Sequence, residues 1–193
     1  KGKTMVEAQV PWLDGLSGKF LLNEWWDSCL ELEKIYSNTD PKLRLKWAGP
    51  EMSARSSITA RQMETWSHGH EIFDLLGQKR KEGDHIKNIV HLGVSTFEWT
   101  FVNRNIQLPK TKPFVLLNLP SKTTITYNEQ CDDNFIKGSA VEFCQVVTQV
   151  RNIDDTNLNV VGDVATTWMQ YAQCFAGQPE DPPQKCTRYI QKI

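Results

Sequence analysis

Hydrophobic positions at helical spacing predict three helices in the first 107 residues. The first covers residues 17–36. The second begins at Ser53 or Ser56, either of which could cap it, and runs to about residue 76, where Gly77 provides a C-terminal stop. The third covers about residues 85–102 and carries an apolar stripe along one face. The pattern therefore indicates a helical N-terminal part.

The pattern changes at residues 108–113, where two prolines indicate a linker. Apolar and β-branched residues then predict strands at 114–119 and 123–127, joined as a hairpin. Two more helices are expected, at about 139–150 and 163–175. The sequence thus predicts an α+β protein with a helical domain over 1–107, a small α+β domain over 108–177 and an extended tail over 178–193.

The charge and apolar content of the 193 residues narrow the class of protein. A net charge of -1 does not indicate electrostatic binding to nucleic acid or to an anionic membrane. No apolar run approaches the roughly 20 residues that span a bilayer. The five cysteines are scattered without a C-x-x-C motif, which favours reduced thiols and a cytoplasmic location. Cys144 and Cys174 fall in apolar helical patterns and are expected in the core.

Glu64 and His68 form the most informative pair, because a spacing of four places both on one face of the second helix. A carboxylate oxygen and an imidazole nitrogen at that spacing can bind one divalent metal ion, although the same pair is common on solvated surfaces. Glu71 lies three residues further on the same face. It is interpreted either as a carboxylate that orients His68 or as a plain solvated side chain.

The other three histidines differ in how well they could serve as a third ligand. His70 points about 200° away from His68 around the helix and is expected on the surface. His85 lies at a helix start and is expected to be exposed. His91 lies on the neighbouring helix and is the better candidate, with a packed and hydrogen-bonded histidine as the alternative.

Three further residues could line a substrate pocket. Arg61 lies one turn before Glu64, so it could pair with that carboxylate or contact an anionic substrate. Trp26 and Trp47 could form part of a pocket wall, with helix packing as the alternative for Trp26.

Several blocks of sequence resemble actinobacterial metal-binding proteins related to mycothiol-dependent maleylpyruvate isomerase, in the DinB-like superfamily. The two longest blocks are Lys46 to Ala54 (KWAGPEMSA) and Thr59 to Gly69 (TARQMETWSHG). The resemblance covers about residues 22–177, and its shorter blocks lie at residues 91–97, 142–149, 155–156 and 172–177.

The resemblance implies a DinB-like four-helix bundle followed by a small α+β domain. It also implies a divalent metal, typically zinc, held by an early histidine and by the Glu and His of the E-x-x-x-H motif, which Glu64 and His68 match. This chain has no histidine before His68, and it opens at Lys1 without an initiator methionine. We therefore expect an internal start, with the first bundle helices absent. The third ligand would then come from His91, from the missing segment or from a partner chain.

The resulting hypothesis is a metal-dependent thiol transferase or isomerase, in which bound zinc activates a low-molecular-weight thiol for addition to an electrophile. Its expected partners are a small-molecule substrate and either a second copy of the chain or the missing segment, with no nucleic acid and no membrane. The alternative is a non-catalytic binding or assembly subunit that keeps the fold with an incomplete metal site.

Overall fold

The computed structural model describes residues 5–13, 15–47 and 51–191. The opening residues 1–4, and residues 48–50 of the expected loop before the second helix, lie outside the described residues. Contacts along the chain group it into two compact units, residues 1–55 and 56–193. The fold is α+β with a helical N-terminal part, which confirms the predicted class.

In its described residues, the first unit contains two helices and one short antiparallel strand pair. Helix α1 (Met5–Leu13) was not predicted, and it contains Pro11, a residue that normally argues against a helix interior. Helix α2 (Gly18–Ser37) confirms the expected helix at 17–36. Strands β1 (Arg44–Leu45) and β2 (Met52–Ser53) pair antiparallel and lead into the long helix that follows.

Helix α3 (Ala54–Leu75) carries the residues that the sequence singled out. It ends where predicted, because Gly77 adopts a left-handed φ of 63° that glycine tolerates without strain. The buried stripe of α3 follows helical spacing and includes polar residues as well as apolar ones: Met63, Trp66, Ser67, His70 and Asp74. The mixed stripe means that the core must supply partners for a histidine and an aspartate.

The single helix expected at 85–102 is wrong in detail, because the structure divides it. A 3₁₀ turn, η1 (Asp84–Ile86), leads into α4 (Lys87–Ser95), and α5 (Phe97–Asn103) follows after Thr96. The Thr96 hydroxyl lies 2.9 Å from the Leu92 carbonyl oxygen, to which it donates. Such a side-chain bond competes with the helix ladder and explains the break.

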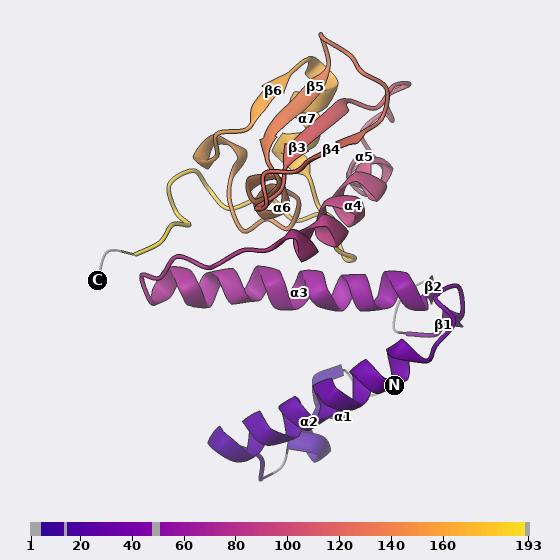
Figure 1. Cartoon of the computed structure of the whole chain (residues 1–193), viewed down its shortest axis with the longest axis vertical. Helices are drawn as coiled ribbons and strands as arrows, with labels where there is room; N and C mark the ends of the chain where they lie inside the picture. Colours follow the sequence, from indigo (N-terminus) through magenta and orange to yellow (C-terminus); the bar gives the residue numbers. More distant parts are fainter. Residues whose placement is uncertain (1–4, 14, 48–50, 192–193) are drawn as a thin grey trace. The chain divides into compact units, whose positions relative to one another are not determined.

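A four-stranded sheet forms the centre of the second unit (Figure 1). Its strands are β3 (Phe114–Asn118), β4 (Thr124–Tyr127), β5 (Phe135–Ser139) and β6 (Asn159–Val161), in the order β4-β3-β5-β6. The β3–β4 hairpin confirms the prediction. Strands β3 and β5 are parallel, with Asn118 opposite Ser139 at their carboxyl ends. Strands β5 and β6 were not predicted from the sequence.

Two helices follow the strands and pack against them. Helix α6 (Ala140–Val147) comes directly after β5. The 3₁₀ turn η2 (Ile153–Asp155) lies between α6 and β6, and α7 (Asp163–Tyr171) follows β6. Both helices end earlier than expected. Gly93 allows α4 to approach α6 closely, since a Cβ there would lie 2.8 Å from Cγ2 of Val147. This close contact packs α4 against α6, the helix that follows strand β5.

One hydrophobic core runs through the second unit from Met63 to Cys174 and includes side chains of α3, α4, α5, the sheet, α6 and α7. The contact grouping therefore differs from the expected division after residue 107, because α4 and α5 share the core of the sheet. Residues 178–191 of the tail, the part that the structure describes, contain no helix or strand and contact this unit through side-chain and backbone hydrogen bonds. No helix in the described ranges is long and apolar enough to cross a membrane.

Candidate functional site

A pocket of about 400 Å³ opens beside α3, and its lining includes Glu64, His68 and Glu71. The lining also includes Thr148 and Gln149, which follow α6, as well as Phe175 and part of the tail. Tail residues that line it are Glu180, Asp181, Pro183 and Arg188. The structure thus brings the three predicted residues of α3 together at one pocket.

Glu64 and His68 stand at the spacing of two ligands of one metal ion. Glu64 Oε2 lies 3.3 Å from His68 Nε2. Bonds of about 2.0–2.1 Å arranged as a tetrahedron around zinc separate neighbouring ligand atoms by about 3.3 Å. The side chains are 53% and 72% exposed, respectively, so an ion could reach them from solvent.

Glu71 faces the other nitrogen of the same imidazole. Its Oε2 lies 4.0 Å from His68 Nδ1, too far for a hydrogen bond but on the side where a metal-binding histidine usually has a carboxylate partner. Arg188 Nη1 of the tail pairs with the other carboxylate oxygen, Oε1 of Glu71. The tail therefore holds Glu71 with one oxygen turned toward His68.

The charge of the pocket suits a cation. Four carboxylates line it and face a single guanidinium, that of Arg188. Asp181 is already paired with Arg104 at 2.8 Å, whereas Glu64 contacts only His68 by an ion pair within the described ranges. Carboxylates and a neutral imidazole are donors that zinc accepts.

The donor set fits two positions of a metal site. In the part of the chain that the structure describes, no cluster of three or more His, Cys, Asp or Glu side chains is arranged to hold a metal ion. His91 does not line the pocket. It is exposed on α4, with its ring centroid 6.1 Å from that of Tyr127 and its Nε2 3.4 Å from Ser95 Oγ. The described residues therefore provide the Glu64–His68 pair without His91.

The remaining sequence-predicted residues are not among those that line this pocket. Arg61 is exposed on α3, outside the lining, and makes no ion pair with Glu64 in the described structure. Trp26 and Trp47 belong to the first unit and are about half-exposed. His85 is exposed, as expected.

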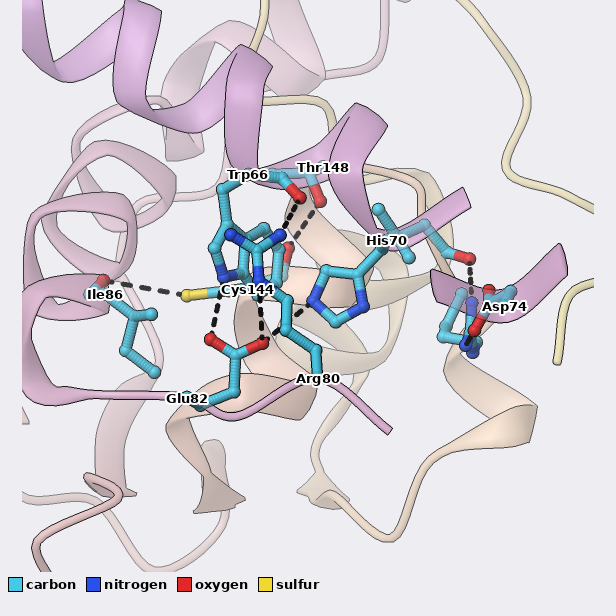
Figure 2. A network of polar contacts seen from close by, with 10 residues as sticks. Trp66, His70, Asp74, Arg80, Glu82, Ile86, Cys144 and Thr148 are labelled. Carbon is cyan, nitrogen blue, oxygen red and sulfur yellow. Dashed lines mark hydrogen bonds and ion pairs between the residues drawn. The ribbon is translucent and has the colours of Figure 1, made fainter. Parts of the chain in front are cut away.

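His70 is buried, which corrects the expectation of a surface histidine. Its side chain is 6% exposed, and Nε2 lies 3.1 Å from Glu82 Oε1 without the direction of a hydrogen bond. Trp66 Nε1 donates to Glu82 Oε2 at 2.9 Å (Figure 2). The signal for burial was present in the sequence, because His70 lies four residues after Trp66 and seven after Met63 on the apolar stripe.

Arg80 completes this network. Its Nη1 donates to the Trp66 carbonyl at 2.8 Å, its Nε lies 3.6 Å from Glu82 Oε1, and its guanidinium lies 5.7 Å from the centroid of the Trp66 ring. Gly69 makes room for it, since a Cβ there would lie 2.8 Å from Arg80 Nη1. This close approach gives a physical reason for a glycine in the middle of α3.

Glu82 stays ionised in this setting. Burial by itself raises the pKa of its carboxyl, but the contacts from His70 and Trp66, with the nearby charge of Arg80, together lower that pKa below its usual value. The network thus fastens the connector at 78–83 to α3 through a charged carboxylate.

A second buried ion pair lies further along α3. Arg151 Nη2 lies 2.6 Å from Asp74 Oδ1, with both side chains about nine-tenths buried. Arg151 also donates from Nη1 to the Val150 carbonyl at 2.9 Å. The backbone N–H of Gln191 donates to the Asp74 carbonyl, so this residue of the tail lies beside the pair.

The core thiols are not available for nucleophilic chemistry. Cys144 and Cys174 are buried, as expected. Burial raises the pKa of both thiols, so neither forms a thiolate at neutral pH.

Comparison with known proteins finds a family model that matches the part of the chain carrying this site. Residues 1–73, which include Glu64, His68 and Glu71, match the family described as "Mycothiol maleylpyruvate isomerase N-terminal domain", a DinB-like family. Two uncharacterized proteins of Mycobacterium tuberculosis, MT0041 of strain CDC 1551 and Rv0036c of strain H37Rv, are each 37% identical over 168 residues. That alignment covers 86% of this chain and 65% of each relative, so the chain spans less than two thirds of their length. No solved structure matches the chain significantly.

Proposed function

Because residues 1–73 match the family model of the mycothiol maleylpyruvate isomerase N-terminal domain, we propose that this protein is a metal-dependent thiol transferase or isomerase. The observation that carries the proposal is the 3.3 Å spacing of Glu64 Oε2 and His68 Nε2 at the wall of a pocket. Glu64 and His68 would hold a zinc ion, with the remaining positions left to substrate, water or a ligand from outside the described residues. When bound, zinc would lower the pKa of a low-molecular-weight thiol, so that the thiolate exists at neutral pH.

The residues of the chain would supply position and shape. Glu71 would orient the imidazole of His68 from the Nδ1 side, and Arg188 would hold Glu71 in place. Phe175 and Pro183 would form the apolar part of the pocket, against which an electrophile could lie.

In the proposed transfer, the thiol gives its proton to water and its sulfur forms a bond to an electrophilic carbon, which either releases a leaving group such as chloride or breaks a π bond whose electrons take up a proton. In an isomerisation, the same addition to a carbon–carbon double bond would be followed by rotation and by elimination of the thiol. The fold alone does not choose between the two reactions.

A thiol-addition assay tests the proposal. Mycothiol would be mixed with 1-chloro-2,4-dinitrobenzene or with maleylpyruvate, and the protein would be wild type, His68→Ala or the matched control His85→Ala. We expect zinc-dependent turnover by the wild type and by His85→Ala, and its loss in His68→Ala.

Equal turnover by the wild type and His68→Ala, or turnover that a chelator leaves unchanged, would contradict the proposal. Metal-independent binding of thiol or substrate would instead favour the alternative of a non-catalytic binding subunit.

A further inference from the structure

A second and larger cavity, of about 960 Å³, lies against a different face of α3 from His68. Its lining includes His70, Asp74 and Arg151, together with the carboxyl ends of β3 and β5 at Asn118 and Ser139. None of the residues lining it belongs to the Glu64–His68 pocket. The cavity is therefore a separate place at which a small molecule could bind, and its volume falls in the range of small-molecule sites.

All three carboxylates in the lining are already engaged by groups of the protein. Asp74 is paired with Arg151, and Glu82 contacts Trp66, His70 and Arg80. Glu142 accepts a hydrogen bond from Asn157 Nδ2 at 2.9 Å. The charges of Asp74 and Glu82 are thus offset by the guanidinium groups of Arg151 and Arg80, whereas Glu142 keeps its charge and is hydrogen-bonded by a neutral amide.

Two cations in the lining have no such partner. Lys79 and Lys81 are exposed, and across the described structure neither makes an ion pair or a side-chain hydrogen bond. Arg80, between them, is turned to α3 by its bond to the Trp66 carbonyl. The positive charge that the cavity can offer to a ligand therefore comes from these two ammonium groups.

The cavity also has an apolar wall. Phe73 of α3, Leu119 after β3 and Val141 of α6 line it, and Ile190 of the tail adds to it. Amide groups are present as well, at Asn118 and Gln145. An apolar wall next to unpaired ammonium groups suits a molecule with an apolar body and an anionic head.

We propose that this cavity is a binding site for a small organic anion, a carboxylate or a phosphate ester, with Lys79 and Lys81 binding the anionic group. The site is independent of the proposed metal chemistry, because it shares no residue with the Glu64–His68 pocket. The apolar part of the ligand lies against Phe73 and Val141.

Titration calorimetry with 1-naphthoate as the probe, and with the neutral 1-naphthalenemethanol as its comparison, tests the proposal. The variants are Lys79→Ala/Lys81→Ala and a matched control, Lys110→Ala/Lys122→Ala, which removes two exposed lysines outside the lining. We expect the first variant to bind naphthoate about tenfold more weakly and the control to bind it like the wild type. The affinity of the wild type should also fall as salt is raised.

Backbone NMR shifts locate the probe. Naphthoate should move the amide signals of Asn118 and Ser139 in the wild type. Equal affinity of the two double variants, equal binding of the neutral analogue, or shifts confined to other parts of the chain would each overturn the proposal. The metal content of the protein should be the same in all variants, so failure here is distinguishable from failure of the metal site.

Discussion

His68 lies between two carboxylates of its own helix, with Nε2 at 3.3 Å from Glu64 Oε2 and Nδ1 at 4.0 Å from Glu71 Oε2. One ring nitrogen and Glu64 have the spacing of metal ligands, and the other nitrogen faces a carboxylate that Arg188 holds. On another face of the same helix, His70 and Asp74 enter the core and contact charged partners. One helix therefore separates an open, polar pocket from a buried ionic network.

Gly69→Ala should destabilise the protein, although alanine is the better helix former by about 1 kcal/mol. The new Cβ would displace Arg80 Nη1 from its bond to the Trp66 carbonyl and loosen its contact with Glu82. A hydrogen bond from a charged group is worth about 1.5–3 kcal/mol. Urea unfolding should show a loss of about 1 kcal/mol.

A double-mutant cycle identifies the cause. In an Arg80→Ala background the Cβ meets no guanidinium, so Gly69→Ala should become neutral or stabilising. The same loss of stability in both backgrounds would mean that Arg80 is not the reason for the glycine.

Asp74→Leu should cost about 3–5 kcal/mol of unfolding free energy, because it leaves the guanidinium of Arg151 buried without its counter-charge. The double variant Asp74→Leu/Arg151→Met should recover much of that loss. Chemical denaturation measures both. As a control, Glu98→Gln removes the exposed ion pair with Lys112 and should cost less than about 1 kcal/mol. A small effect of Asp74→Leu would show that the pair is solvated.

Glu82 should make the free energy of unfolding depend on pH in the acidic range. Its pKa is lower in the folded state than its ordinary value of 4.5, so its contribution is present above pH 4.5 and is lost as pH falls through the lowered pKa. Glu82→Gln should therefore be less stable at neutral pH and show a shallower fall in stability below pH 4.5. Parallel pH–stability curves for the two proteins would refute a charged, tightly bound Glu82.

The long elements and the Glu64–His68 pair could be predicted because each depends on local spacing. Helices α2 and α3 follow from apolar periodicity. The end of α3 could be predicted from Gly77, because a helix often ends where one residue adopts a left-handed backbone conformation. The burial of His70 depends on Glu82, twelve residues later on an irregular connector, and the angle between His70 and His68 around the helix does not reveal that partner. Its place on the apolar stripe was the stronger signal.

Other features depend on distant parts of the chain. Strand β6 has three residues and is defined by its pairing with β5, such as Phe135 opposite Val161, so its own sequence carries little pattern. The contact of Arg188 with Glu71 joins residues 117 positions apart. No local rule brings such a pair together, and therefore the role of the tail at the pocket appears only in the structure.

Metal content, measured by elemental mass spectrometry on purified wild type, His68→Ala and the control His85→Ala, tests the central claim most directly. We predict about one zinc ion per chain in the wild type and in His85→Ala, and a loss of zinc in His68→Ala with the fold unchanged by circular dichroism. The same low zinc content in all three folded proteins after incubation with zinc, or full zinc in His68→Ala, would contradict a metal site at Glu64 and His68.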